Sequence, residues 1–170
     1  SHGIHAHIRN TYTEYSVHDN AFYVLEGRAV IVKEPPLNKS AIGPYIPPTL
    51  REFRYSTYVT GQAAWDDSPL YIWDEWNAYV NGAEVGMSRF TEGLWDEGWR
   101  DQSGNMEFVI YSMAVGLAVE SLSPEYIEEN PNFLQFLAWN TQRAMNLHRE
   151  FASIGAFQSD RSDDLLEGLQ

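Results

Sequence analysis

A long apolar segment at residues 105–120, NMEFVIYSMAVGLAVE, predicts the central helix of the fold. Its apolar side chains fall on every side of a helical projection, so we expect this helix to be buried all round. A short helix is predicted to start at Ser123-Pro124, and a long one at Asn130-Pro131. The long helix extends to about residue 154, with an apolar stripe at Phe133, Leu137, Ala144, Leu147 and Phe151.

Two further helices are predicted before the central one. Residues 69–81, within PLYIWDEWNAYVNG, follow a Ser-Pro start signal, and the Asn-Gly pair at 81–82 supplies a stop. A threonine cap predicts a second helix over residues 49–61. The stretch 82–104 is broken by glycines and contains a second acid pair.

The β-structure is predicted near the N-terminus. Residues 21–25 and 29–33 are rich in strand-forming side chains and are joined by Glu-Gly-Arg, which is typical of a β-hairpin. Residues 35–48 contain five prolines, which favours an ordered loop without regular structure.

These elements predict a mainly α-helical α+β fold, with one N-terminal β-hairpin packed on a bundle of about four or five helices. The length suits a single domain over residues 1–170. Its expected parts are a histidine-containing segment (1–20), the hairpin (21–34), the proline-rich loop (35–48), the helical part (49–157) and a frayed acidic tail (158–170).

Composition narrows the possible partners. The formal net charge of −13 argues against nucleic acid and anionic membranes, and no apolar run reaches the ~20 residues that span a bilayer. Neutral glycans, peptides, cations and basic proteins stay open. The absence of cysteine excludes disulfides and thiolate chemistry. The chain starts at Ser1 rather than at a methionine, a processed-looking N-terminus that slightly favours a secreted or periplasmic location.

Two carboxylate pairs lie between tryptophans. Asp74 and Glu75 are flanked by Trp73 and Trp76, while WDEGW at 95–99 repeats the pattern in a glycine-containing stretch. The predicted 69–81 helix has no wide polar face, so at least one of its acids should be partly buried. A buried carboxylate needs an ion pair, hydrogen bonds or a metal.

The pair Asp74 and Glu75 has two interpretations that would meet this requirement. A structural one ties the acids to an arginine at position 51, 54 or 89, or makes one of them cap the backbone amides of another helix. A functional one makes Asp74 and Glu75 catalytic. The second pair, at 96–97, is expected to consist of solvated loop acids.

Histidines cluster at the N-terminus in HGIHAHIRN. On a strand, His5 and His7 would point the same way, which suits two ligands of one metal ion. On a helix, His2 and His5 would instead be neighbours. His5 and His7 are therefore candidate metal ligands.

The segment PLYIWDEWNAYVNG resembles the helix that carries the third zinc ligand in gluzincin metallopeptidases of the lethal-factor-like kind. The resemblance covers about fifteen residues and implies that Glu75 is the third ligand of a zinc ion. The chain contains no HExxH motif, and in SHGIH only His5 matches its register. The resemblance implies a zincin-like domain, either a metal-dependent, peptidase-like hydrolase or a degenerate and inactive relative.

Two alternatives come from other classes of function. A carbohydrate-binding or glycoside-hydrolase-type domain would stack sugars on aromatic rings and use the carboxylates as acid and base. Its candidate substrate-binding residues are Trp73, Trp76, Tyr79, Trp95 and Trp99. A non-catalytic interaction domain would instead bury most of these aromatic side chains in its core.

Overall fold

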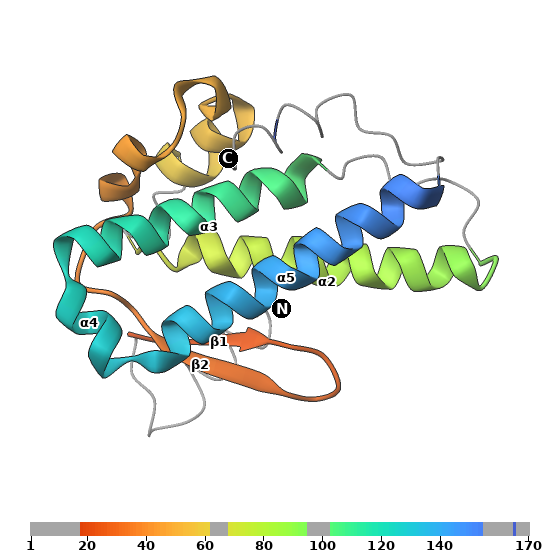
Figure 1. Ribbon diagram of the computed structural model, residues 1–170, viewed down its shortest axis with the longest axis horizontal. Coiled ribbons are helices and arrows are strands. Elements are labelled where there is room, and N and C mark those ends of the chain that lie inside the picture. Colours follow the sequence, from red (N-terminus) through yellow and green to blue (C-terminus); the bar gives the residue numbers. More distant parts are fainter. Residues whose placement is uncertain (1–17, 62–67, 95–102, 155–164, 166–170) are drawn as a thin grey trace.

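The computed structural model describes residues 18–61, 68–94, 103–154 and 165. It confirms a mainly α-helical α+β fold in which a two-stranded antiparallel hairpin lies against a group of helices (Figure 1). The elements in chain order are β1 (Asp19–Tyr23), β2 (Ala29–Lys33), the 3-10 helices η1 (Lys39–Tyr45) and η2 (Pro48–Leu50), the π-helix η3 (Tyr55–Thr60), α2 (Tyr71–Thr91), α3 (Ser103–Leu122), α4 (Pro124–Glu129) and α5 (Pro131–Ile154).

Three long helices, α2, α3 and α5, pack on one another, and short α4 joins α3 to α5 (Figure 1). The predicted starts of α4 and α5 are confirmed. The prediction that α3 is buried on every side is wrong, because Met113 and Leu117 are 38% and 49% exposed. The acidic tail lies outside the described residues except for Leu165, which is buried.

Helix α2 is longer than the sequence predicts. The expected stop at Asn81-Gly82 is wrong, since the helix continues through both residues to Thr91. The added turns bury Ala83 and Met87. This burial offsets the poor helix propensity of the Asn-Gly pair, as tertiary packing commonly does.

The start of α2 is held by a residue far away in sequence. The side chain of Glu34 accepts hydrogen bonds from the Leu70 backbone N–H (2.8 Å) and from the Asn20 amide (2.7 Å). A carboxylate at this position satisfies a free backbone donor at the helix start and complements the helix dipole. Glu34 therefore links β1 to the first turn of α2.

The proline-rich and threonine-capped segments also differ from their predictions. Residues 35–48 were expected to lack regular structure, but η1 spans Lys39–Tyr45. The single helix expected over 49–61 is instead split between η2 and the π-helix η3. Short π-helical turns are rare and often occur at functional sites.

The hairpin is confirmed, with β1 starting two residues earlier than predicted. Ala21 pairs with Ile31, and the chain reverses through Leu25, Glu26 and Gly27, which all have positive φ angles (69°, 52° and 73°). Only glycine adopts this region without steric cost. The packed strands therefore hold the turn in a conformation that Leu25 would avoid by itself.

Side chains from three helices bond to backbone carbonyls on the two outer edges of the hairpin. On β1, the Tyr23 carbonyl accepts hydrogen bonds from the amides of Asn77 (2.9 Å) and Asn81 (3.0 Å) on α2. On β2, the Lys33 carbonyl accepts one from the Tyr126 hydroxyl, and the Ile31 carbonyl accepts one from Asn132. Covering exposed edges in this way prevents unwanted strand pairing.

Candidate functional site around Glu75

The four residues Trp73 to Trp76 occupy different environments on α2. Trp73, Asp74 and Trp76 are each 0% exposed, whereas Glu75 is half-buried. The expectation that at least one acid is buried is thereby confirmed. Asp74 lies in the first turn of α2, where the helix dipole stabilises a negative charge.

The two tryptophan rings belong to the aromatic core. The ring of Trp73 stacks on Phe133 with centroids 4.5 Å apart, and Trp76 meets Phe136 edge-on at 6.2 Å. Their 0% exposure leaves no ring face on the surface to receive a sugar. Trp73 and Trp76 are consequently not substrate platforms in this structure. Trp95, Trp99, His5 and His7 lie outside the described residues.

The site that α2 does present is a line of polar side chains one helical turn apart. Tyr71, Glu75 and Tyr79 are spaced by four residues, so they share one face of the helix. The Tyr71 hydroxyl donates a hydrogen bond of 2.7 Å to Oε1 of Glu75. This contact fixes the orientation of the Glu75 carboxylate, which the sequence alone does not determine.

A second pair of hydroxyls joins this line from η3. The hydroxyl oxygens of Tyr58 and Tyr79 are 3.4 Å apart, and both rings pack against Phe108 of α3 with centroid distances of 5.1 and 4.8 Å. Packing on the core holds both hydroxyls in place. Because Tyr58 belongs to the π-helix η3, this contact joins η3 to α2.

A buried lysine completes what we call the Glu75 cluster: Lys39, Tyr58, Tyr71, Glu75 and Tyr79. Lys39 is 4% exposed, and its ammonium donates to the Tyr58 carbonyl (3.1 Å) and lies 5.2 Å from the centre of the Tyr71 ring. A buried ammonium is stabilised by carbonyl and aromatic contacts of this kind.

Tyr58 and Tyr71 of the cluster keep their protons. Burial raises the pKa of Tyr71 above its ordinary value, and the hydrogen bond to Glu75 and the charge of that carboxylate raise it further. Burial also raises the pKa of Tyr58, with smaller contributions from Tyr79 and Glu75. The Tyr58 and Tyr71 hydroxyls are thus hydrogen-bond donors at neutral pH, which suits them to orient a carboxylate or bind an oxygen atom that gains negative charge.

A buried ion pair supports the cluster from α3. Arg54 donates to Glu107 over 3.1 Å, and their side chains are 14% and 5% exposed. Next to it, Gly104 packs against Tyr79 so closely that an added Cβ would lie 2.8 Å from the ring. Of the arginines considered as structural partners for the acid pair, Arg51 donates to the Gly43 and Ile46 carbonyls instead.

The described residues contain part of the predicted metal site. Within 18–61, 68–94, 103–154 and 165, no group of three or more histidine, aspartate or glutamate side chains is arranged to hold a metal ion. Glu75 is the one predicted ligand that the structure describes, and its hydrogen bond from Tyr71 is typical of the support that metal-bound carboxylates receive. Metal binding by Glu75, His5 and His7 stays a prediction.

Glu75 and Tyr79 were predicted from the sequence as site residues, but Lys39, Tyr58 and Tyr71 were not. The Tyr71–Glu75 pair has the i, i+4 spacing that a helical projection detects. Tyr58 and Lys39 come from segments whose local structure was predicted wrongly, so no sequence signal placed them here.

Comparison of the chain with family models, curated proteins and solved structures finds no match. In the part of the chain that the structure describes, every helix is too short or too polar to cross a membrane.

Proposed function

We propose that the protein is a zincin-like, metal-binding domain of the hydrolase type, with Glu75 as a zinc ligand. The observation that carries the proposal is the half-buried Glu75 carboxylate, oriented by the Tyr71 hydroxyl at 2.7 Å within a cluster of tyrosine side chains. Together with His5 and His7, Glu75 would supply the nitrogen and oxygen ligands that zinc prefers. When bound, zinc would polarise a carbonyl or lower the pKa of a water molecule.

Residues of the chain would have distinct roles in such a site. Tyr71 would hold the Glu75 carboxylate in position, as hydrogen-bond partners of metal ligands do. Tyr58 and Tyr79 would offer hydroxyl donors to a substrate oxygen. Asp74 has no such role in the proposal, because it is fully buried on another side of α2.

The experiment is metal analysis of the full chain purified without a histidine tag. We expect about one bound zinc per chain and a rise in melting temperature when zinc is added. Glu75→Gln and a His5→Ala/His7→Ala double variant should each lose this zinc. Glu92→Gln, on the exposed end of α2, is the matched control and should retain it.

Absence of zinc from the wild-type protein, together with no thermal shift on zinc addition, would overturn the proposal. Equal zinc content in wild type and Glu75→Gln would also overturn it, provided circular dichroism shows both proteins folded. Peptidase activity is a separate readout, since a degenerate relative would bind zinc without hydrolysing peptides.

A further inference from the structure

A surface groove lies between the hairpin and the first half of α5, at a different place from the Glu75 cluster. Its volume is about 560 Å³, and its lining includes Arg28, Ala29 and Ile31 from the hairpin with Gln135, Phe136 and Trp139 from α5. The groove thus combines strand backbone on one side with an aromatic ring on the other.

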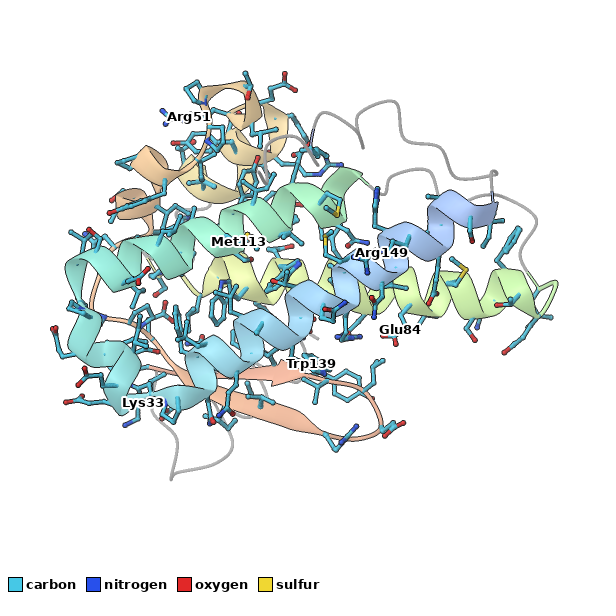
Figure 2. The ribbon with its side chains drawn as sticks, in the orientation of Figure 1. Lys33, Arg51, Glu84, Met113, Trp139 and Arg149 are labelled. Atoms are coloured by element: carbon cyan, nitrogen blue, oxygen red, sulfur yellow. The ribbon has the colours of Figure 1, made fainter. Side chains whose placement is uncertain are left out.

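Trp139 is presented to this groove in a fixed orientation. Its side chain is 40% exposed and lies on the side of α5 that faces the hairpin (Figure 2). The Arg143 guanidinium lies 4.5 Å from the ring centre and is itself bound by Glu84 and Asn81. A large ring that is held in place yet accessible is a frequent anchor in protein recognition.

The outer edge of β2 leaves backbone groups open along the same groove. Because Val24 donates to the Arg28 carbonyl and Ala21 pairs with Ile31, the ladder alternation turns the N–H and C=O groups of Ala29 and Ile31 away from β1. Asn132 occupies the Ile31 carbonyl. The Ala29 N–H, the Ala29 carbonyl and the Ile31 N–H have no hydrogen-bond partner among the described residues.

We propose that this groove binds an extended peptide segment of another protein, which pairs antiparallel with β2 at Ala29–Ile31 and places an apolar side chain against Trp139. A peptide backbone supplies the alternating donors and acceptors that these three groups require, as in other cases of strand addition. Asn132 and Tyr126 occupy the neighbouring Ile31 and Lys33 carbonyls, which limits pairing to this short stretch. The inference does not depend on metal binding at Glu75.

The test begins with a phage-displayed library of random octapeptides, selected on the immobilised full chain. Enriched peptides are then synthesised, labelled and titrated with wild type and variants by fluorescence anisotropy. Ala29→Pro removes an amide hydrogen that faces away from β1, so it preserves the hairpin ladder. Ala29→Thr retains that hydrogen and is the matched control. Trp139→Ala is paired with Leu134→Ala, which removes another exposed side chain of α5.

We expect Ala29→Pro to weaken peptide binding about 3- to 10-fold, the effect of roughly one hydrogen bond. Trp139→Ala should weaken it about 10-fold or more, as expected for an anchor residue. Ala29→Thr and Leu134→Ala should stay within about twofold of wild type. Hydrogen exchange on the wild-type protein gives a readout independent of the variants, and the peptide should slow exchange of the Ile31 amide.

Three outcomes would overturn the proposal. The first is failure of the library to yield a binding peptide. The second is unchanged exchange at Ile31 when a selected peptide is bound. The third is binding of cellohexaose or chitohexaose that is lost in Trp139→Ala but retained in Ala29→Pro, without any peptide binding, which would make the groove a glycan site.

Discussion

Asn77 and Asn81 lie one turn apart on α2 and share a single acceptor, the backbone carbonyl of Tyr23. Either residue alone still satisfies that carbonyl. We expect Asn77→Ala and Asn81→Ala each to lower the free energy of unfolding by about 0.5–1.5 kcal/mol. The double variant should lose more than the sum, because it leaves the Tyr23 carbonyl unpaired.

Urea denaturation of the four proteins in this cycle measures the coupling. Asn146→Ala, at an exposed position of α5, is the control for replacing an asparagine. Strict additivity of the two changes would contradict the shared-acceptor account. Since Asn81 also accepts a hydrogen bond from Arg143, its single variant should be the more destabilised of the two.

The hairpin turn depends on Gly27. Its φ of 73° lies in the left-handed region, and nothing lies within 4 Å of an added Cβ, so the cost of a side chain there is conformational rather than steric crowding. Gly27→Ala should lower stability by roughly 1 kcal/mol. Gly27→Asn should lower it less, since asparagine tolerates this region better. The two midpoints of urea denaturation give the comparison, and equal midpoints would show that the turn has another conformation.

Tyr71→Phe removes the hydroxyl that orients Glu75 while keeping the ring beside Lys39. If Glu75 binds zinc, zinc affinity should fall about 10- to 100-fold, the usual effect of removing a hydrogen bond to a metal ligand. Tyr58→Phe is the control, because its hydroxyl lies against Tyr79 rather than Glu75. Competition with a zinc chelator measures both affinities, and an equal effect of the two variants would argue against a specific role for Tyr71.

Stability should fall steeply at high pH. The pKa values of Tyr58, Tyr71 and Tyr126 are all raised, mainly by burial, above the value of about 10 for an unfolded chain. Above about pH 10 the unfolded chain releases phenolic protons that the folded protein keeps, so unfolding becomes more favourable as pH rises.

Each of these tyrosines can contribute at most about 1.4 kcal/mol per pH unit to this fall. Below about pH 10 their contribution is fully present and independent of pH. Tyr71→Phe should make the fall shallower, whereas Tyr45→Phe removes a phenol outside these contacts and is the control. Urea denaturation between pH 8 and about 11 tests the sign, and stability that rises over this interval would contradict it.

Local signals were sufficient to predict the hairpin and helices α3, α4 and α5. Proline at the starts of α4 and α5 marks both positions, and the periodic stripe on α5 predicts its buried face. The prediction that α2 ends at Asn81-Gly82 was wrong, because burial of Ala83 and Met87 outweighs the low helix propensity of that pair. No local pattern indicated that Pro48–Thr60 would divide into 3-10 and π-helical turns.

The candidate sites were predicted less completely than the fold. Glu75 was selected because its predicted helix lacks a wide polar face and resembles a third-ligand helix. Trp73 and Trp76 were selected as rings that could stack on sugars, but the core encloses both. Burial of a ring depends on which helices cover it, and a single helix does not contain that information. Trp139 was missed for the same reason, since only the neighbouring hairpin makes it part of a groove.

The side chains that cover the hairpin edges are synthesised after the hairpin itself. The side chains that cover β1 come 54 and 58 residues after Tyr23, and those that cover β2 come 93 and 101 residues after their acceptors. A chain emerging from the ribosome therefore presents both strand edges before it can protect them. Fragments that end before Tyr126 should aggregate through β2, so we expect the nascent hairpin to need a chaperone until α5 is made.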